Sequence, residues 1–251
     1  MQNSAGMVKF VYMLLLASDL DGTFLGGDRE EKEQLYRLIA ENPVVTLVFV
    51  TGRGMGTVLP LLEDPFIPDP HYIIADVGAT VVDGRTLEPI EPLHTEIEKR
   101  WPGAEAVRAK MEGIAGLRLQ PVPMGRRVSY FYDPGIDVNE IERRATALGC
   151  DVIVSAGRYI DVLPGGVNKG FTLTHLMEML QVPENEVLVA GDTLNDLSLF
   201  QTGYRGVVVG GAEQRLIEAT AGQSQVFQAQ RLGAGGILQA LHHYNTIPDG
   251  I

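Results

Sequence analysis

The chain has 251 residues, with 20 Lys and Arg against 32 Asp and Glu, which gives a formal net charge of −12. This length suits one core or a core with one inserted unit, and the acidic balance argues against nucleic acid as a partner, because phosphate backbones are bound by clustered Lys and Arg. The lone cysteine, Cys150, excludes an internal disulfide framework and favours a reducing compartment, so we expect a cytoplasmic protein.

Apolar strands alternate with helices in the first and last thirds of the chain. The run Phe10 to Ala17 is too short to cross a bilayer and leads into acidic residues instead of a cleavage site, so we interpret it as a buried strand after a ragged extension. Val44 to Val50 is a continuous β-branched run, typical of a parallel strand covered on both faces. Similar runs predict strands at 13–17, 72–75, 187–190 and 205–209.

Helical patterns lie between these strands. Asp28 and Glu31 resemble a capping box, and Leu35, Leu38 and Ile39 follow at helical spacing. Further helices are predicted at 171–180 and 211–221. The alternation predicts an α/β fold with a doubly wound, Rossmann-like parallel sheet, whose ligand site lies beyond the carboxyl ends of the strands.

The middle of the chain has a different pattern. Residues 82–164 contain short or alternating strands and two helical stretches, typical of a small α+β unit with an antiparallel sheet. We interpret this unit as a cap inserted into a core made of residues 1–81 and 165–251. The strands are predicted at 117–122, 127–132, 151–155 and 159–163, and the helices at 97–113, interrupted by Pro102, and at 138–148.

Two carboxylates follow the first strand, in Asp19-Leu20-Asp21-Gly22-Thr23. The two-residue period of an extended chain can turn both to one side. One could attack phosphorus and form an aspartyl phosphate, while the other donates a proton to the leaving sugar oxygen and later accepts one from water. Gly22 would let the backbone approach the phosphate, and its amide could help bind it. Alone, the segment is equally well explained as a turn with helix-cap chemistry.

Two further segments offer groups that bind phosphate. Thr51-Gly52-Arg53 ends the second strand with a hydroxyl and a guanidinium. Lys169, in Asn168-Lys169-Gly170, stands at a predicted helix start, where it could neutralise phosphate and hold the charge of the nucleophile. Taken singly, Thr-Gly is a common sequence where a strand ends in a loop, and a lone lysine is more often a solvated surface residue.

A fourth segment, Gly191 to Asp196, follows another apolar strand and reads Gly-Asp-Thr-Leu-Asn-Asp. Its oxygen side chains suit a hard cation such as Mg²⁺, which keeps several waters and needs few protein ligands. An ordinary strand-to-helix loop with a capping residue is the alternative. A structural zinc site is not expected, because the histidines show no zinc-like spacing with one another or with the cysteine. They are His71, His94, His175, His242 and His243.

The order of these four segments resembles the four motifs of the haloacid dehalogenase superfamily, over the whole predicted core. The insert between the second and third motifs, and Asp161-Val162-Leu163-Pro164 before Asn168, resembles the branch with a type II cap, which includes many sugar phosphatases. The resemblance implies that Asp19 is the nucleophile and Asp21 the acid/base partner.

The same resemblance implies the phosphate and metal ligands. Phosphate would be bound by Gly22, Thr51, Gly52 and Lys169. Magnesium would be held by Asp19, Asp192 and the backbone carbonyl of Asp21, with Asn195 and Asp196 organising these ligands.

Within this branch the chain looks most similar to the sucrose-phosphate phosphatases. The similar segments are 127–130, 133–134, 157–158, 161–164, 205–209 and 234–238. The family resemblance implies an acidic residue after a Val-Gly pair at the crossing from core to cap, but Val77-Gly78 is followed here by Ala79 and the shorter, neutral Thr80. This departure weakens the case for sucrose 6-phosphate as the substrate, and mannosylfructose phosphate and glycosylglycerate phosphate remain open as candidates. The candidates for substrate contact are Arg53, Thr80, Arg127, Arg158, Asp161 and Asn168.

The sequence therefore predicts a magnesium-dependent phosphatase for a phosphorylated sugar, with a disaccharide phosphate such as sucrose 6-phosphate as the expected substrate. A sugar-phosphate mutase, which shares the aspartyl phosphate, is one alternative. A non-catalytic partner of a synthase is another, because such domains also resemble the tail regions of some sugar-phosphate synthases. We expect a possible glycosyltransferase or synthase partner, no membrane partner and a chain that is plausible as a monomer.

Overall fold

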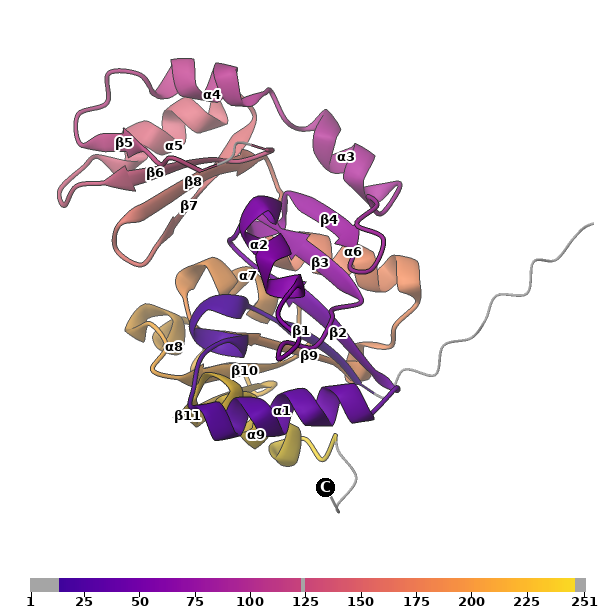
Figure 1. Ribbon diagram of the computed structural model, residues 1–251. Helices are drawn as coiled ribbons and strands as arrows, with labels where there is room; N and C mark the ends of the chain where they lie inside the picture. The colour runs from indigo at the N-terminus through magenta and orange to yellow at the C-terminus, as the bar shows by residue number, and fades with distance from the viewer. Residues whose placement is uncertain (1–13, 123–124, 247–251) are drawn as a thin grey trace, which may run out of the picture.

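The computed structural model describes residues 14–122 and 125–246, which form two parts, a larger core and a smaller cap (Figure 1). The predicted ragged extension and the beginning of the first apolar run lie outside the described residues. Among the residues that are described, no helix is both long and apolar enough to cross a membrane.

The core is built on a seven-stranded sheet with the order β11-β10-β9-β1-β2-β3-β4. All neighbours are parallel except β3 and β4, which pair antiparallel. The prediction of a doubly wound parallel sheet is confirmed, and the two edge strands β4 and β11 were not predicted. The strands are β1 (Leu14–Ser18), β2 (Val45–Val50), β3 (Tyr72–Ala75), β4 (Thr80–Asp83), β9 (Val187–Gly191), β10 (Arg205–Gly210) and β11 (Val226–Leu232).

Helices cover both faces of this sheet. On one face, α1 (Arg29–Glu41) and α9 (Gly233–His243) pack on the sheet. On the other lie α6 (Lys169–Leu180), α7 (Leu197–Phe200) and α8 (Gln214–Thr220). The short helix α2 (Met55–Leu62) follows β2 and contributes Val58 to the first face. The carboxyl ends of the strands are left uncovered by these layers, which is where an α/β sheet binds its ligands.

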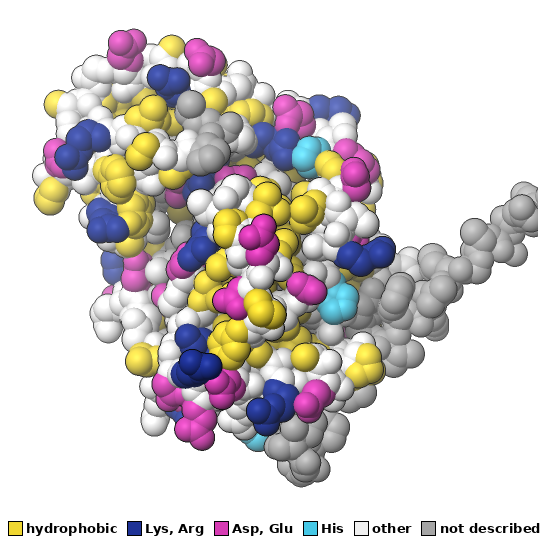
Figure 2. Space-filling view, viewed as in Figure 1, with side chains coloured by type: hydrophobic (Ala, Val, Ile, Leu, Met, Phe, Trp, Pro, Cys, Tyr) yellow, Lys and Arg dark blue, Asp and Glu magenta, His cyan; other side chains and the backbone are white. Residues whose placement is uncertain are grey.

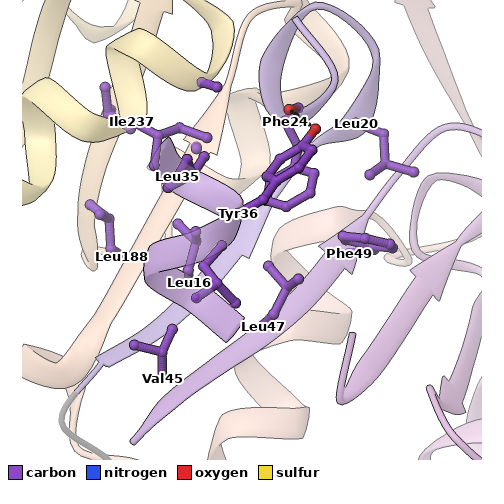
Figure 3. Packing of buried hydrophobic residues seen from close by; sticks show 14 of the residues in the cluster. Leu16, Leu20, Phe24, Leu35, Tyr36, Val45, Leu47, Phe49, Leu188 and Ile237 are labelled. Carbon is purple, nitrogen blue, oxygen red and sulfur yellow. Dashed lines mark hydrogen bonds between the residues drawn. The ribbon is translucent and has the colours of Figure 1, made fainter. Parts of the chain in front are cut away.

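The face under α1 shows why the sequence folds this way. Asp28 accepts a hydrogen bond from the backbone N–H of Glu31 at 2.8 Å, so the predicted helix start is confirmed. Leu35 then lies between the sheet and α9 with no exposed surface (Figure 3). Tyr36 stacks on Phe24 with ring centroids 4.7 Å apart, which ties α1 to the segment just after the first strand. Truncating a buried leucine of this kind to alanine typically costs about 2–5 kcal/mol.

The cap holds a four-stranded antiparallel sheet with the order β5-β6-β8-β7, and α4 and α5 pack on it around their own hydrophobic cluster. The helix predicted in this region is interrupted at Pro102, as expected, and its two parts are α3 and α4. The elements are α3 (Leu93–Lys99), α4 (Ala104–Met111), β5 (Leu117–Leu119), β6 (Val128–Tyr132), α5 (Val138–Thr146), β7 (Cys150–Ser155) and β8 (Tyr159–Pro164).

The boundary predicted at residue 82 falls inside β4, a strand of the core sheet. Leu93 and Ile97 of α3 also belong to the hydrophobic cluster of the core. We therefore propose that the cap begins after α3, near residue 100, and ends with β8.

Candidate active site

The site lies at the carboxyl ends of three neighbouring strands. Asp19 follows β1, Thr51 follows β2 and Asp192 follows β9, and β1 lies between the other two in the sheet. Because parallel strands present their carboxyl ends at one edge, segments far apart in the sequence meet there. Lys169 joins them as the first residue of α6.

Lys169 is the centre of a buried charged cluster. Its side chain has no exposed surface, and its Nζ donates to Asp19 Oδ1 at 2.7 Å, to Asp196 Oδ1 at 2.6 Å and to Asn195 Oδ1 at 2.9 Å. An ammonium group has three donors, so all of them are engaged. Burial alone would lower the pKa of Lys169, but Asp19 and Asp196 raise it above its usual value, so the amine stays charged. The lysine therefore holds the charge of the predicted nucleophile.

Asp19 itself is almost fully buried, with 5% of its surface exposed. Burial raises the pKa of its carboxyl group well above the usual value, and the Lys169 ammonium opposes that rise. Further positive charge at the site would favour the ionised carboxylate that a nucleophilic role requires.

Asp196 organises the loop after β9. Its Oδ2 accepts from the backbone N–H groups of Asp192 and Thr193, each at 3.0 Å, while its Oδ1 faces Lys169. The residue has no exposed surface. Both oxygens are thus engaged within the protein, which fits the predicted role of holding the metal ligands and not that of a ligand itself.

The donor set fits a divalent cation. Carboxylate oxygens of Asp19 and Asp192, the two predicted side-chain ligands, lie within 4.8 Å of each other and of one from Asp196, which holds them in place. Asp192 Oδ1 accepts only one hydrogen bond among the described residues, from Thr23 Oγ1 at 3.1 Å. Burial, together with the charge of Asp196, raises the pKa of Asp192 to about 7. Mg²⁺ prefers hard oxygen ligands such as these carboxylates. Its positive charge would also relieve the repulsion between them.

Gly22 allows this close approach. Its φ is +82°, and a Cβ atom built on it would lie 2.1 Å from Asp192 Oδ2. Any side chain at this position would both strain the backbone and displace Asp192.

Asp21 and Arg53 form a two-pronged ion pair at the mouth of the site. Arg53 Nε donates to Asp21 Oδ2 at 2.8 Å and Nη2 donates to Oδ1 at 2.5 Å. The Asp21 side chain is 62% exposed, in contrast to Asp19. Thr51 Oγ1 accepts from the Arg53 N–H at 3.1 Å, and a hydroxyl that accepts there still has its own proton to donate.

A cavity of about 380 Å³ lies between core and cap above these residues. The core supplies acidic, basic and hydroxyl side chains, and the cap supplies mostly neutral ones. The lining consists of Asp19, Asp21, Gly52, Arg53, Gly54, Thr57, Thr193 and Asn195 from the core, and Gln120, Val122, Arg127, Ser155, Ala156, Tyr159 and Asp161 from the cap.

Two predicted substrate residues of the cap, Arg127 and Asp161, line this cavity but are held by other groups. Arg127 Nη1 donates to the Gly52 carbonyl at 2.5 Å and lies 3.5 Å from Asp161 Oδ1, and its Nε lies 3.4 Å from Asp76 Oδ1. Ser129 donates to Asp161 at 2.5 Å. This buried cluster joins cap strands to the loop after β2.

Thr80 is placed away from the cavity. It is 8% exposed, lies outside the cavity lining and donates its hydroxyl to Asp76 Oδ2 at 2.9 Å. Burial raises the pKa of Asp76, with Arg127 opposing. Asp76 was missed in the sequence, where the only signal was an acidic residue directly after the apolar run 72–75. Its φ of 51° and that of Val77, 57°, mark a strained crossing toward the cap.

Arg158 and Asn168 also have other roles in this structure. The Arg158 guanidinium lies over the Tyr159 ring, 4.5 Å from its centroid, and contacts its hydroxyl. Asn168 caps α6 by accepting from the Phe171 N–H at 2.8 Å. Neither residue lines the cavity.

Charged side chains of both signs are interspersed over the face shown in Figure 2, so the net charge of −12 is not gathered in one patch there. Two cationic side chains of the core, Lys169 and Arg53, lie at the site, and each is paired with carboxylates there.

Comparison with known proteins connects this geometry to relatives. The chain is 49% identical over 235 residues to the glucosylglycerol-phosphate synthase of Pseudomonas anguilliseptica, covering 93% of this chain but only 31% of that protein. It is 29% identical to the mannosylfructose-phosphate phosphatase of Agrobacterium fabrum, covering 93% and 98% of the two chains. It is 30% identical to sucrose-phosphatase 1 of Nicotiana tabacum, where the coverage is 94% and 60%.

A solved structure of a sucrose-phosphatase has a similar fold. The sucrose-phosphatase from Synechocystis sp. PCC6803, solved in complex with sucrose and phosphate, superposes with a TM-score of 0.84 at 28% identity, covering 93% of this chain and 98% of that one. A haloacid dehalogenase subclass IIB sugar phosphatase shares the fold, with a TM-score of 0.65 at 16% identity. The profile of sucrose-6F-phosphate phosphohydrolase matches residues 12–245. The chain therefore belongs to the sucrose-6F-phosphate phosphohydrolase family, sugar phosphatases of the haloacid dehalogenase superfamily.

Proposed function

We propose that this protein is a magnesium-dependent phosphatase that hydrolyses a phosphorylated sugar through an aspartyl phosphate on Asp19. The observation that carries the proposal is the convergence of Asp19, Thr51, Lys169 and Asp192 at one edge of the sheet, beneath a cavity that the cap completes. The chemistry needs a buried nucleophile, a neighbouring proton carrier and local positive charge, and we assign these roles to Asp19, to Asp21 and to Lys169 with Arg53.

In the first step an Asp19 oxygen forms a bond to phosphorus, and the bond between phosphorus and the sugar oxygen breaks. Asp21 gives its proton to that leaving oxygen. The arriving phosphate competes for Arg53 and releases Asp21 from its ion pair, and the freed carboxylate takes up a proton from solvent before it donates that proton to the leaving oxygen. In the second step water attacks phosphorus, Asp21 takes up the proton of the water, and Asp19 is regenerated with release of phosphate.

Asp19, Asp192 and the backbone carbonyl of Asp21 would hold the Mg²⁺ ion. When bound, the ion supplies positive charge that offsets the negative charge of the phosphoryl oxygens. Thr51 and the amides after β1 and β2 orient the phosphate, and Lys169 keeps Asp19 and Asp196 in place.

The substrate is proposed from the relatives. A sugar larger than one ring fits the position of the cavity, which extends from Asp19 to cap residues such as Gln120 and Tyr159. Sucrose 6-phosphate and mannosylfructose phosphate are the disaccharide candidates. The 49% identity to a glucosylglycerol-phosphate synthase favours glucosylglycerol phosphate as a third candidate and a synthase as a partner.

The test of the mechanism is Asp19→Asn. We expect it to abolish magnesium-dependent phosphate release, whereas Asp28→Asn, at an exposed helix cap where asparagine also caps well, should keep the wild-type rate. Near-normal turnover by Asp19→Asn would refute the covalent mechanism. Asp21→Asn should lose turnover while it still binds the sugar phosphate.

A panel of phosphorylated mono- and disaccharides together with glucosylglycerol phosphate would identify the substrate. Free phosphate that accumulates in step with substrate loss supports a phosphatase, and an isomeric sugar phosphate without free phosphate would identify a mutase. Binding of sugar phosphate with no turnover in the presence of Mg²⁺ would identify a non-catalytic partner of a synthase.

A further inference from the structure

The turn between β7 and β8 reaches from the cap back to the core, where in Figure 1 the hairpin extends toward α7 and α8. Ala156 at this turn has a φ of 50°, and its backbone N–H donates to Glu213 Oε1 at 2.8 Å. Glu213 belongs to the core and directly precedes α8. Because Ala156 lines the cavity, this hydrogen bond crosses from cap to core at the cavity wall.

The second oxygen of the same carboxylate faces the active-site loop. Glu213 Oε2 accepts from the Leu194 N–H at 2.9 Å, inside the segment that carries Asp192 and Asp196. The backbone N–H of Glu213 donates to the Asp192 carbonyl at 2.8 Å. One residue thus holds the tip of the cap hairpin and the loop of the predicted metal ligands at the same time.

We propose that Glu213 is a positioning residue that latches the cap closed over the active-site loop, so that closure of the cap and order in the loop are coupled. The inference rests on the proposed function. A carboxylate that accepts one hydrogen bond from each side makes both only while the hairpin tip is seated, and bonds to an ionised acceptor are stronger than neutral ones. A single partly exposed contact of this kind is weak enough to break when product leaves.

The side-chain chemistry is specific. Glutamine at this position keeps the length of the side chain but presents an NH₂ group to one of the two N–H donors, so it can accept on one side only. Glu213→Gln therefore removes one arm of the latch with little change in shape. Glu218→Gln is the matched control, because Glu218 lies in α8, the helix that Glu213 precedes, accepts from the Gln214 side chain and is not part of the cavity lining.

The experiment measures the hydrolysis of two phosphate esters and the hydrogen exchange of one backbone amide. For a sugar phosphate that the wild type hydrolyses, Glu213→Gln should lower kcat/KM about tenfold, the effect of one hydrogen bond to a charged group. Hydrolysis of p-nitrophenyl phosphate, which has no sugar for the cap to enclose, should stay within about twofold of wild type. Hydrogen exchange at the Ala156 amide should accelerate in Glu213→Gln and not in Glu218→Gln.

Equal losses on both esters would show that Glu213 acts through the loop alone, and unchanged sugar-phosphate turnover or unchanged Ala156 exchange would show that no latch operates. Each of these results would overturn the proposal. If the wild type released phosphate from no sugar phosphate at all, the proposed function would fail, and the exchange of the Ala156 amide would still decide whether the hydrogen bond to Glu213 protects the hairpin tip.

Discussion

The floor of the cavity and its cap wall hold their polar groups in different ways. On the floor, Asp19, Lys169 and Asp196 are buried, and the lysine ammonium is paired with a carboxylate oxygen of each aspartate. On the wall, apart from the buried and paired Arg127 and Asp161, the lining side chains are neutral, such as Gln120, Val122 and Tyr159. Changes on the floor leave charges unpaired, whereas changes at the neutral positions of the wall alter contacts one at a time. We therefore expect relatives named for sucrose, mannosylfructose and glucosylglycerol phosphates to differ more on the wall than on the floor.

The strongest way to test the floor is Lys169→Met. This change keeps the length of the side chain but leaves Asp19 and Asp196 buried without their cation, so we expect a loss of about 3–5 kcal/mol in the free energy of unfolding, the cost of breaking a buried ion pair. Phosphate release should be abolished. Lys99→Met, on an exposed position of α3, is the control and should change stability by less than about 0.5 kcal/mol. Denaturant unfolding measures both, and similar midpoints for the two variants would contradict the role given to Lys169.

A smaller effect is expected from Gly22→Ala. The positive φ costs about 1–3 kcal/mol for a non-glycine residue, and the new Cβ would also displace Asp192. Gly103→Ala is a matched control, because Gly103 has a φ of +96° but a Cβ added there would meet no atom within 4 Å. Both variants should lose stability in thermal unfolding, Gly22→Ala by more because of the added clash, and only Gly22→Ala should lose activity. Equal activity in the two would mean that the close approach to Asp192 is not needed.

The acidic cluster also predicts a dependence on pH. The pKa of Asp192 is raised from 3.8 to about 7, so the folded state binds its proton more tightly than the unfolded state does. The resulting stability is fully present below pH 3.8 and is lost as the pH rises through 7. Mg²⁺ competes with that proton, so the rise in Tm on adding Mg²⁺ should be larger at about pH 8 than at about pH 5.5. A rise that is the same at both pH values would contradict the assignment of Asp192 as a ligand, and Asp192→Asn should abolish it.

The sequence predicted the floor better than the wall for a physical reason. Asp19, Thr51 and Asp192 each follow a strand of one parallel sheet, and strand ends converge whatever the helices between them contain. Lys169 alone looked like a surface residue, and only contacts across 150 positions explain why it is fully buried. Thr80 was expected to face a sugar, but its hydroxyl donates to Asp76, a partner that no periodic pattern marks. Glu213 was missed because its role depends on where the cap lies relative to the core.

The smallest expected effect concerns the wall, at Tyr159→Phe. Tyr159 lines the cavity and its ring packs beside Phe131 with centroids 5.7 Å apart, so the change removes a hydroxyl and keeps the packing. One lost hydrogen bond to a sugar is worth about 0.5–1.5 kcal/mol, which corresponds to a rise of at most about tenfold in KM for the sugar phosphate. The kcat and the turnover of p-nitrophenyl phosphate should not change, and Tyr132→Phe, in the same sheet but outside the cavity lining, should behave as wild type. A loss of p-nitrophenyl phosphate turnover as large as the loss for the sugar phosphate would mean that the wall takes part in the phosphate chemistry, and the distinction between floor and wall would no longer hold.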